Sequence, residues 1–186
     1  MTDKDFTPTK EQISLHGLGF IQVIMPNNAR LHVWHPDLPR RSCFEHSSIH
    51  NHRFGFESRV LIGTQVNQKA MVRESEHGGY DIVSHDGPRS EKGGRLSYVS
   101  GRADVILLHP MSYGPGDSYI MDPFDYHRTP CEGVVVTYMT KRHESREKHA
   151  CSLIVHGQEF DQSFDRFALS PDELWAVVLD ALKHGA

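Results

Sequence analysis

The sequence predicts an all-β domain, a sandwich or barrel of short strands, followed by one C-terminal α-helix. Three observations favour this fold class. Apolar residues alternate with polar ones over many short stretches, and glycine, proline and asparagine separate these stretches every several positions. Apolar residues at helical spacing occur in the last part of the chain. Many short strands followed by a single helix are typical of a barrel with a helical cover.

At 186 residues, the chain is long enough for one domain with a substantial core and too short for a second full domain. We expect three parts: an N-terminal arm over residues 1–19, a β-barrel domain over 20–156, and a helical extension over 157–186 that packs on the barrel. The arm is expected to hold at most one short helical turn, which Gly17 ends.

The expected strands follow one another between residues 20 and 156. The segment 43–52 is expected to be extended and to carry a pair of histidines at its end. The segment 84–94 is polar and contains glycine, which indicates a hairpin loop or a mobile flap. The predicted strands are residues 20–25, 30–34, 43–52, 56–62, 64–73, 80–83, 96–99, 103–108, 118–121, 134–140 and 151–156.

The C-terminal helix has a clear start signal. Ser170 is the expected N-cap, Pro171 occupies the first helical position, and Glu173 completes a capping box. The apolar residues of this helix form one stripe, made of Leu174, Val177, Val178, Ala181 and Leu182. Such a stripe predicts packing against the sheet or a contact between two copies of the chain.

The composition excludes several classes of function. A net charge of −4 gives no basic surface of the kind that nucleic-acid binding uses. The N-terminus has no apolar signal core, and no run approaches the ~20 apolar residues of a membrane span. The three cysteines are odd in number and lack zinc-finger spacing, so neither a disulfide framework nor a zinc finger is implied. We therefore expect a cytoplasmic protein with no nucleic-acid or membrane partner.

A pair of histidines carries the functional prediction. His50 and His52 lie two residues apart, so on a strand both side chains leave the same face. His127, from a distant strand, is the candidate third ligand. Three imidazoles that converge in this way suit a divalent metal with open coordination positions. The isolated histidines are expected to be surface or hydrogen-bonded residues: His16, His32, His77, His109, His149 and His184.

These residues resemble the two motifs of cupins, small jelly-roll barrels that carry a metal site. The first cupin motif runs histidine, any residue, histidine, three or four residues, glutamate, and a glycine after a strand. The second runs from a glycine through a Pro-x-Gly-like turn to a single histidine. The matching residues are His50, His52, Glu57 and Gly63, then Gly114, Pro115, Gly116, Asp117, Pro123 and His127. The resemblance covers residues 44–140 and implies a cupin-type double-stranded β-helix, or jelly-roll barrel.

A narrower resemblance links residues 47–52, Ser-Ser-Ile-His-Asn-His, to the iron site of cysteine dioxygenases, thiol-oxidising cupins whose iron is held by three histidines. His127-Arg128 is similar to the His-Arg of their third ligand. Animal cysteine dioxygenases have a cysteine at the position of Glu57, so their thioether crosslink cannot form here. Their Ser-His-Tyr relay is not reproduced. The nearest candidates are Val136, Tyr138 and Thr140.

Glu57 is the ambiguous position. Counted forward from His52 it fits the cupin glutamate, but counted back from Gly63 the usual spacing places Phe56 there. If the even-numbered residues of strand 56–62 face inward, Glu57 points away from the metal. If the odd-numbered residues face inward, Glu57 is a fourth ligand or an acid/base, and Arg59 can anchor an acidic substrate. The even-numbered set is more apolar, but a bulge at Gly55 would reset the register, so both alternatives stay open.

The resemblance implies a metal-binding cupin, first of all a non-haem Fe(II) dioxygenase that acts on a small polar substrate such as a thiol or carboxylate. The expected metal ligands are His50, His52 and His127, with Glu57 as the candidate fourth and Tyr138 as a further catalytic candidate. Ni, Mn, Cu and Zn are the alternative metals, and a homodimer is the expected assembly. Two rival hypotheses are a metal-dependent isomerase or lyase with Glu57 as base and a non-catalytic cupin that binds a small molecule.

Overall fold

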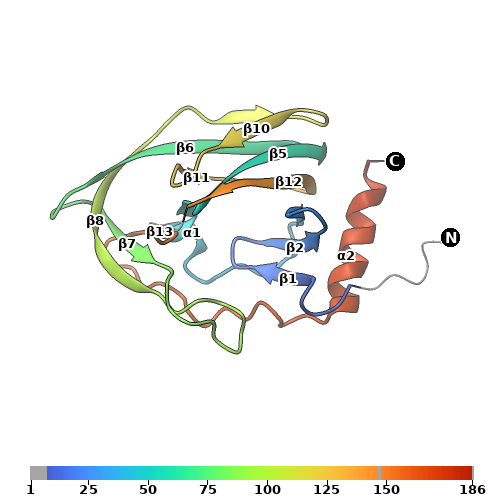
Figure 1. Cartoon of the computed structure of the whole chain (residues 1–186), viewed down its shortest axis with the longest axis horizontal. Helices are drawn as coiled ribbons and strands as arrows, with labels where there is room; N and C mark the ends of the chain where they lie inside the picture. The colour runs from blue at the N-terminus through green and yellow to red at the C-terminus, as the bar shows by residue number, and fades with distance from the viewer. Residues whose placement is uncertain (1–7, 146–147, 186) are drawn as a thin grey trace.

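The computed structural model describes residues 8–145 and 148–185, and it consists mostly of strands with one helix at the C-terminal end (Figure 1). The elements are β1 (Ile13–His16), β2 (Phe20–Met25), β3 (Ala29–Trp34), α1 (Phe44–Ser47), β4 (Ile49–His50), β5 (Phe54–Ile62), β6 (Gln65–Glu74), β7 (Tyr80–Ser84), β8 (Tyr98–Leu107), β9 (Met111–Tyr113), β10 (Ser118–Met121), β11 (Tyr126–Arg128), β12 (Val135–Glu144), β13 (Cys151–Val155) and α2 (Pro171–Lys183). The predicted β class and the C-terminal helix are confirmed.

The strands form two antiparallel sheets. The order in the first sheet is β1-β2-β3-β12-β5-β10, and the order in the second is β11-β4-β13-β7-β8-β6-β9. Because β11 pairs with β6 as well as with β4, the second sheet closes into a ring of β11, β4, β13, β7, β8 and β6. This closed ring confirms a barrel, and it brings β4 and β11, which carry predicted metal ligands, side by side.

The C-terminal helix covers one face of the first sheet. That face packs against α2, where Leu174, Val178 and Ala181 are each at most 1% exposed. Figure 1 shows α2 at the end of the molecule opposite to β7 and β8. The capping box at Ser170 and Glu173 forms as predicted. Most of the apolar stripe of the helix therefore packs within the chain, whereas Leu182 is exposed. The contact between two copies stays a prediction.

Part of the predicted N-terminal arm belongs to the sheet. Residues 1–7 lie outside the described part of the chain, but β1 pairs with β2 along its whole length. Ile13 and Leu15 are buried in the core between the first sheet and α2 because every second residue of β1 faces that core. Residues 13–16, which the prediction assigned to the arm, thus form a strand of the core.

Two further segments differ from the sequence expectation. The span 43–52 is not extended throughout, because α1 precedes β4 and the backbone N–H of His46 donates to the carbonyl of Cys43. The two strands expected at 96–99 and 103–108 are the single strand β8, with a register shift opposite Ile82 and Val83. In the described part of the chain, no helix has the length and apolar character needed to cross a membrane.

Candidate metal centre

The three predicted histidines come together where β4 meets β11. His50 lies directly opposite His127 in this antiparallel pair, and His52 follows two residues later. Asn51, between them, turns the other way, and its Oδ1 accepts a hydrogen bond of 2.7 Å from the backbone N–H of Cys151 on β13. One ligand atom from each histidine lies within 4.8 Å of the other two. Strand alternation and register together place the three imidazoles at one point.

Hydrogen bonds fix the orientation of two of the imidazoles. His50 Nδ1 lies 3.0 Å from the carbonyl oxygen of Ser48, and His127 Nδ1 lies 2.7 Å from Oδ1 of Asn67. Both partners are acceptors, so each Nδ1 carries the proton and donates it. The Nε2 atoms of His50 and His127 are therefore unprotonated, which is the arrangement found in metal-binding histidines.

The distance between two of the ligand nitrogens fits a metal ion. The Nε2 atoms of His52 and His127 are 3.1 Å apart, and His52 Nε2 can donate a hydrogen bond to the lone pair of His127 Nε2. Two nitrogen ligands at about 2.1 Å from a metal and at a right angle to each other are about 3.0 Å apart. The distance between His52 and His127 thus matches that of neighbouring ligands around one ion.

The three imidazoles are held in the neutral form that ligation requires. Burial lowers the pKa of His50 to about 4, although the hydrogen bond to the Ser48 carbonyl opposes this shift. Burial, followed by the effect of neighbouring basic side chains, lowers the pKa values of His52 and His127 well below the usual range. At neutral pH no proton competes with a metal for these nitrogens.

A cavity of about 120 Å³, the inner chamber, opens in front of all three histidines. The side chains that face it from the first sheet include Phe20, Arg30, His32, Trp34, Phe56 and Tyr119. Arg30 brings a cation, whose Nη1 donates to Gln22 Oε1 over 2.9 Å and whose guanidinium lies 5.3 Å from the ring centre of Phe54. The chamber is therefore aromatic, with one positive charge.

Two polar atoms of the inner chamber residues have no partner in the described chain. His32 Nε2 and Trp34 Nε1 are both buried without a hydrogen bond. Burial lowers the pKa of His32 to about 3 and raises the pKa of Tyr119 to about 12, so both side chains are neutral at physiological pH. His32 is thus neither a surface residue nor, at Nε2, a hydrogen-bonded one, and a polar ligand in the chamber could pair with it.

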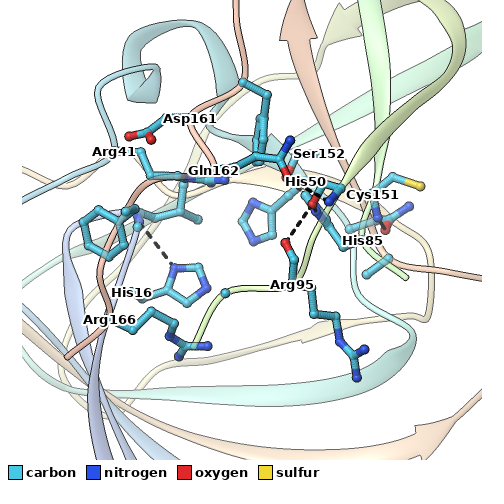
Figure 2. Close-up of a pocket in the computed structure, with 18 of the residues that line it drawn as sticks. His16, Arg41, His50, His85, Arg95, Cys151, Ser152, Asp161, Gln162 and Arg166 are labelled. Carbon is cyan, nitrogen blue, oxygen red and sulfur yellow. Dashed lines mark hydrogen bonds between the residues drawn. The ribbon is translucent and has the colours of Figure 1, made fainter. Parts of the chain in front are cut away.

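A second and larger cavity, the outer chamber, adjoins the first. Its volume is about 250 Å³, and it shares His16, His50 and His52 with the inner chamber. Its remaining wall includes Arg41, His85, Arg95, Ser152, Phe160 and Arg166. Figure 2 shows His16 and Arg166 on one side of this chamber and His85 and Arg95 on the other, with His50 between them.

The structure does not bring Glu57, Arg59 and Tyr138 to the three histidines. From Phe56 to Ile62 the even-numbered residues of β5 are buried, whereas Glu57 pairs with Arg142 at 3.3 Å and is 44% exposed. Arg59 is exposed on the same outward face. The pairing of β5 with β10 runs without a shift from Phe56 to Arg59. The pairing with β12 does shift opposite Gly55 and opposite Leu61, but Glu57 and Arg59 stay on the outward face.

Tyr138 lies opposite Arg59 on β12, on the outward face, and is 37% exposed. The only predicted site residues that the structure gathers are therefore the three histidines. The cation in the inner chamber is Arg30, which the sequence did not single out.

Asn67 is a second site residue that sequence reasoning missed, although a signal for it exists. Gln65 and Asn67 are 0% and 4% exposed, so two polar residues occupy successive inward positions of β6. Polar residues at core positions of a strand indicate a hydrogen-bonding role. No comparable local signal marks Arg30 or His16.

No family model matches the chain, and no curated protein sequence matches it. The cupin resemblance therefore depends on the two motifs and on the barrel that carries the three histidines. A three-histidine group of this geometry can bind a divalent metal.

Proposed function

We propose that this protein is a cupin-type enzyme that holds a divalent metal, Fe(II) in the first place, and oxidises a small polar molecule with dioxygen. The supporting observation is the ligand set: three neutral imidazoles converge in front of an aromatic chamber, and no carboxylate of the described residues joins them. Three facial ligands leave a metal with open positions; non-haem iron oxygenases use two histidines and a carboxylate for this, and here a third histidine would take the place of the carboxylate.

The chain would hold, orient and shield the reactants. A bound Fe(II) would supply redox chemistry with dioxygen and open positions for the substrate. Arg30 would bind a carboxylate or another anionic group of the substrate, since it is the cation of the inner chamber. Phe20, Phe54 and Phe56 would exclude water, and the unpartnered His32 Nε2 would accept or donate one hydrogen bond according to its tautomer.

The geometry argues against the isomerase or lyase hypothesis. That hypothesis used Glu57 as the general base, and Glu57 faces outward, where it is paired with Arg142. A general base must lie within hydrogen-bond reach of the proton it removes. That the substrate is a thiol or a carboxylate remains part of the proposal. Measured turnover of a substrate distinguishes an enzyme from a non-catalytic binding protein.

The test combines metal content with oxygen uptake. Protein purified without a histidine tag should carry about one equivalent of transition metal by elemental analysis. His52→Ala should lose it, while His109→Ala, which removes an exposed histidine outside the group, should keep it. Iron-loaded protein should consume oxygen with at least one member of a panel of small thiols and carboxylic acids.

Two results would contradict the proposal. Equal metal content in His52→Ala and in the wild type would contradict the proposed metal site. Full metal loading with no oxygen uptake across the panel, but with saturable binding of one panel member, would instead favour a non-catalytic binder.

A further inference from the structure

The outer chamber concentrates positive charge in a protein whose net charge is negative. Arg41, Arg95 and Arg166 line it, and Asp161 is the one acidic residue among its lining residues. The whole chain, by contrast, has a net charge of −4. A cationic pocket in an acidic protein attracts small anions and not macromolecular polyanions, because the field is confined to the cavity.

Arg41 is a half-buried cation with an unused donor. Its Nε is buried and has no hydrogen-bond partner among the described residues, and none of their carboxylates forms an ion pair with it. Its guanidinium lies over Phe160, with 4.7 Å from Cζ to the ring centre. Gly17 makes room for its stem, since a Cβ there would lie 2.7 Å from Arg41 Cγ. The side chain is thus held in place while its Nε–H stays available.

A group of arginines reinforces this charge. Arg166 Nε donates to the carbonyl of Leu15 at 3.0 Å and its Nη2 donates to Ser14 Oγ at 3.1 Å, which fixes the guanidinium without neutralising it. Burial, together with repulsion from Arg89 and Arg30, lowers the pKa of Arg166 to about 10. It remains charged at neutral pH. Cations that repel one another in a partly buried region favour a bound anion.

His85 and Asp161 are already occupied by local hydrogen bonds. Ser97 Oγ donates to the Arg95 carbonyl and so accepts from His85 Nδ1, while Ser152 Oγ donates to His85 Nε2. Asp161 accepts from the backbone N–H groups of Ser42 and Ser163 and from Ser163 Oγ. The groups left to meet a ligand are the guanidinium of Arg41, the exposed Arg95 and the remaining N–H groups of Arg166.

We propose that the outer chamber binds a small oxyanion, a carboxylate or a phosphate group, with Arg41 as its principal contact and with Arg166 and Arg95 beside it. A guanidinium presents parallel N–H donors that match both kinds of oxyanion. Because the chamber adjoins His50 and His52, this group would be a second anionic group of the molecule that reacts at the metal centre, in addition to the one that Arg30 would bind. Only this assignment of the anionic group to the reacting molecule rests on the proposed function.

The test measures binding of malonate and of inorganic phosphate to the full-length, metal-loaded protein by isothermal titration calorimetry. We expect saturable binding of at least one probe, and Arg41→Met should weaken it about ten- to hundredfold through the loss of charged hydrogen bonds. Arg142→Met is the matched control, because it removes an arginine that is paired with Glu57 on the outward face. Binding of malonate alone indicates a carboxylate, and binding of phosphate alone a phosphate group.

A variant of the metal centre separates this proposal from the proposed function. His127 lines the inner chamber but not the outer one, so His127→Ala should lose the metal and still bind the probe. Loss of probe binding in folded His127→Ala would show that the anion sits on the metal and would overturn the proposal. If circular dichroism shows that Arg41→Met is unfolded, Arg95→Met at the chamber mouth should weaken binding about threefold. No binding of either probe to the wild type, or unchanged affinity in the folded arginine variants, would also overturn it.

Discussion

The inner and outer chambers share His16, His50 and His52, yet they are built from different parts of the chain. Strands line the inner chamber, and the hydrogen-bond ladders of both sheets fix their positions. The wall of the outer chamber comes largely from connecting segments, the loop after β3, the hairpin between β7 and β8, and the stretch between β13 and α2. The difference suggests a division of roles, with metal ligands on the rigid barrel and recognition on the loops.

The connecting segments of the outer chamber are tied to one another. Lys92 Nζ donates to the Ser163 carbonyl at 3.1 Å, and the backbone N–H of Arg166 donates to the Lys92 carbonyl at 3.0 Å. The backbone N–H of Ser97 donates to Gln162 Oε1 at 2.9 Å. The segment 84–94, for which a mobile flap was one of two predictions, is thus hydrogen-bonded to the stretch between β13 and α2. The two segments form one wall of the chamber.

Removing a ligand should have the largest effect and should affect the inner chamber alone. His127→Ala should lower metal affinity by more than about 100-fold, because two imidazoles do not complete the facial set. A competition titration with a chelator measures this affinity. Wild-type affinity in His127→Ala would mean that the barrel holds the metal elsewhere.

Removing the partner of that ligand should have a smaller effect. Asn67→Ala deletes the acceptor for His127 Nδ1 and should weaken metal binding about ten- to hundredfold. Asn67→Asp keeps an acceptor oxygen at the same place and should retain more of the affinity. The same chelator competition applies, and equal losses in the two variants would show that the hydrogen bond itself has no role.

The outer chamber wall should contribute a pH-dependent term to stability. Burial acts to raise the pKa of Asp161, but hydrogen bonds from Ser163 and Ser42 outweigh it and lower the pKa to about 2, below the ordinary value near 3.9. A carboxyl group with a lowered pKa stabilises the fold above its unfolded pKa and loses that contribution as the pH falls through the folded value.

Asp161→Asn should therefore be less stable than the wild type by about 0.5–1 kcal/mol at neutral pH, after allowance for solvent screening. The difference should shrink between about pH 4 and pH 2. Urea unfolding across this range measures it. A stability difference that stays constant with pH would assign the effect to packing and not to the charge.

The smallest effect is expected on the outward face of β5. Glu57→Gln removes an exposed ion pair with Arg142 and should change stability by less than about 0.5 kcal/mol, with no change in metal affinity. Unfolding in urea and the chelator titration measure the two quantities. A marked loss of metal in Glu57→Gln would mean that β5 changes register when the metal binds.

The sequence predicts the parts of this site that depend on local spacing. His50 and His52 follow from a two-residue period, and the turn before His127 returns a third imidazole to them. The inward parity of β5 could not be decided in advance, because a glycine at position 55 leaves the register free until β10 and β12 pair with the strand. Arg41 and Arg166 join one chamber only through contacts between distant segments, which no local pattern encodes.

The position of β4 also has a consequence for the time course of folding. His50 is paired on one side with His127 and on the other with Ser152, so both neighbours of this two-residue strand are made long after it. Asn51 and Cys151, joined by a hydrogen bond, are 100 residues apart in sequence. At about 5–20 residues per second, a ribosome takes on the order of 5–20 s to deliver the missing strand. A metal ion that needs all three histidines would therefore bind only to a nearly complete barrel.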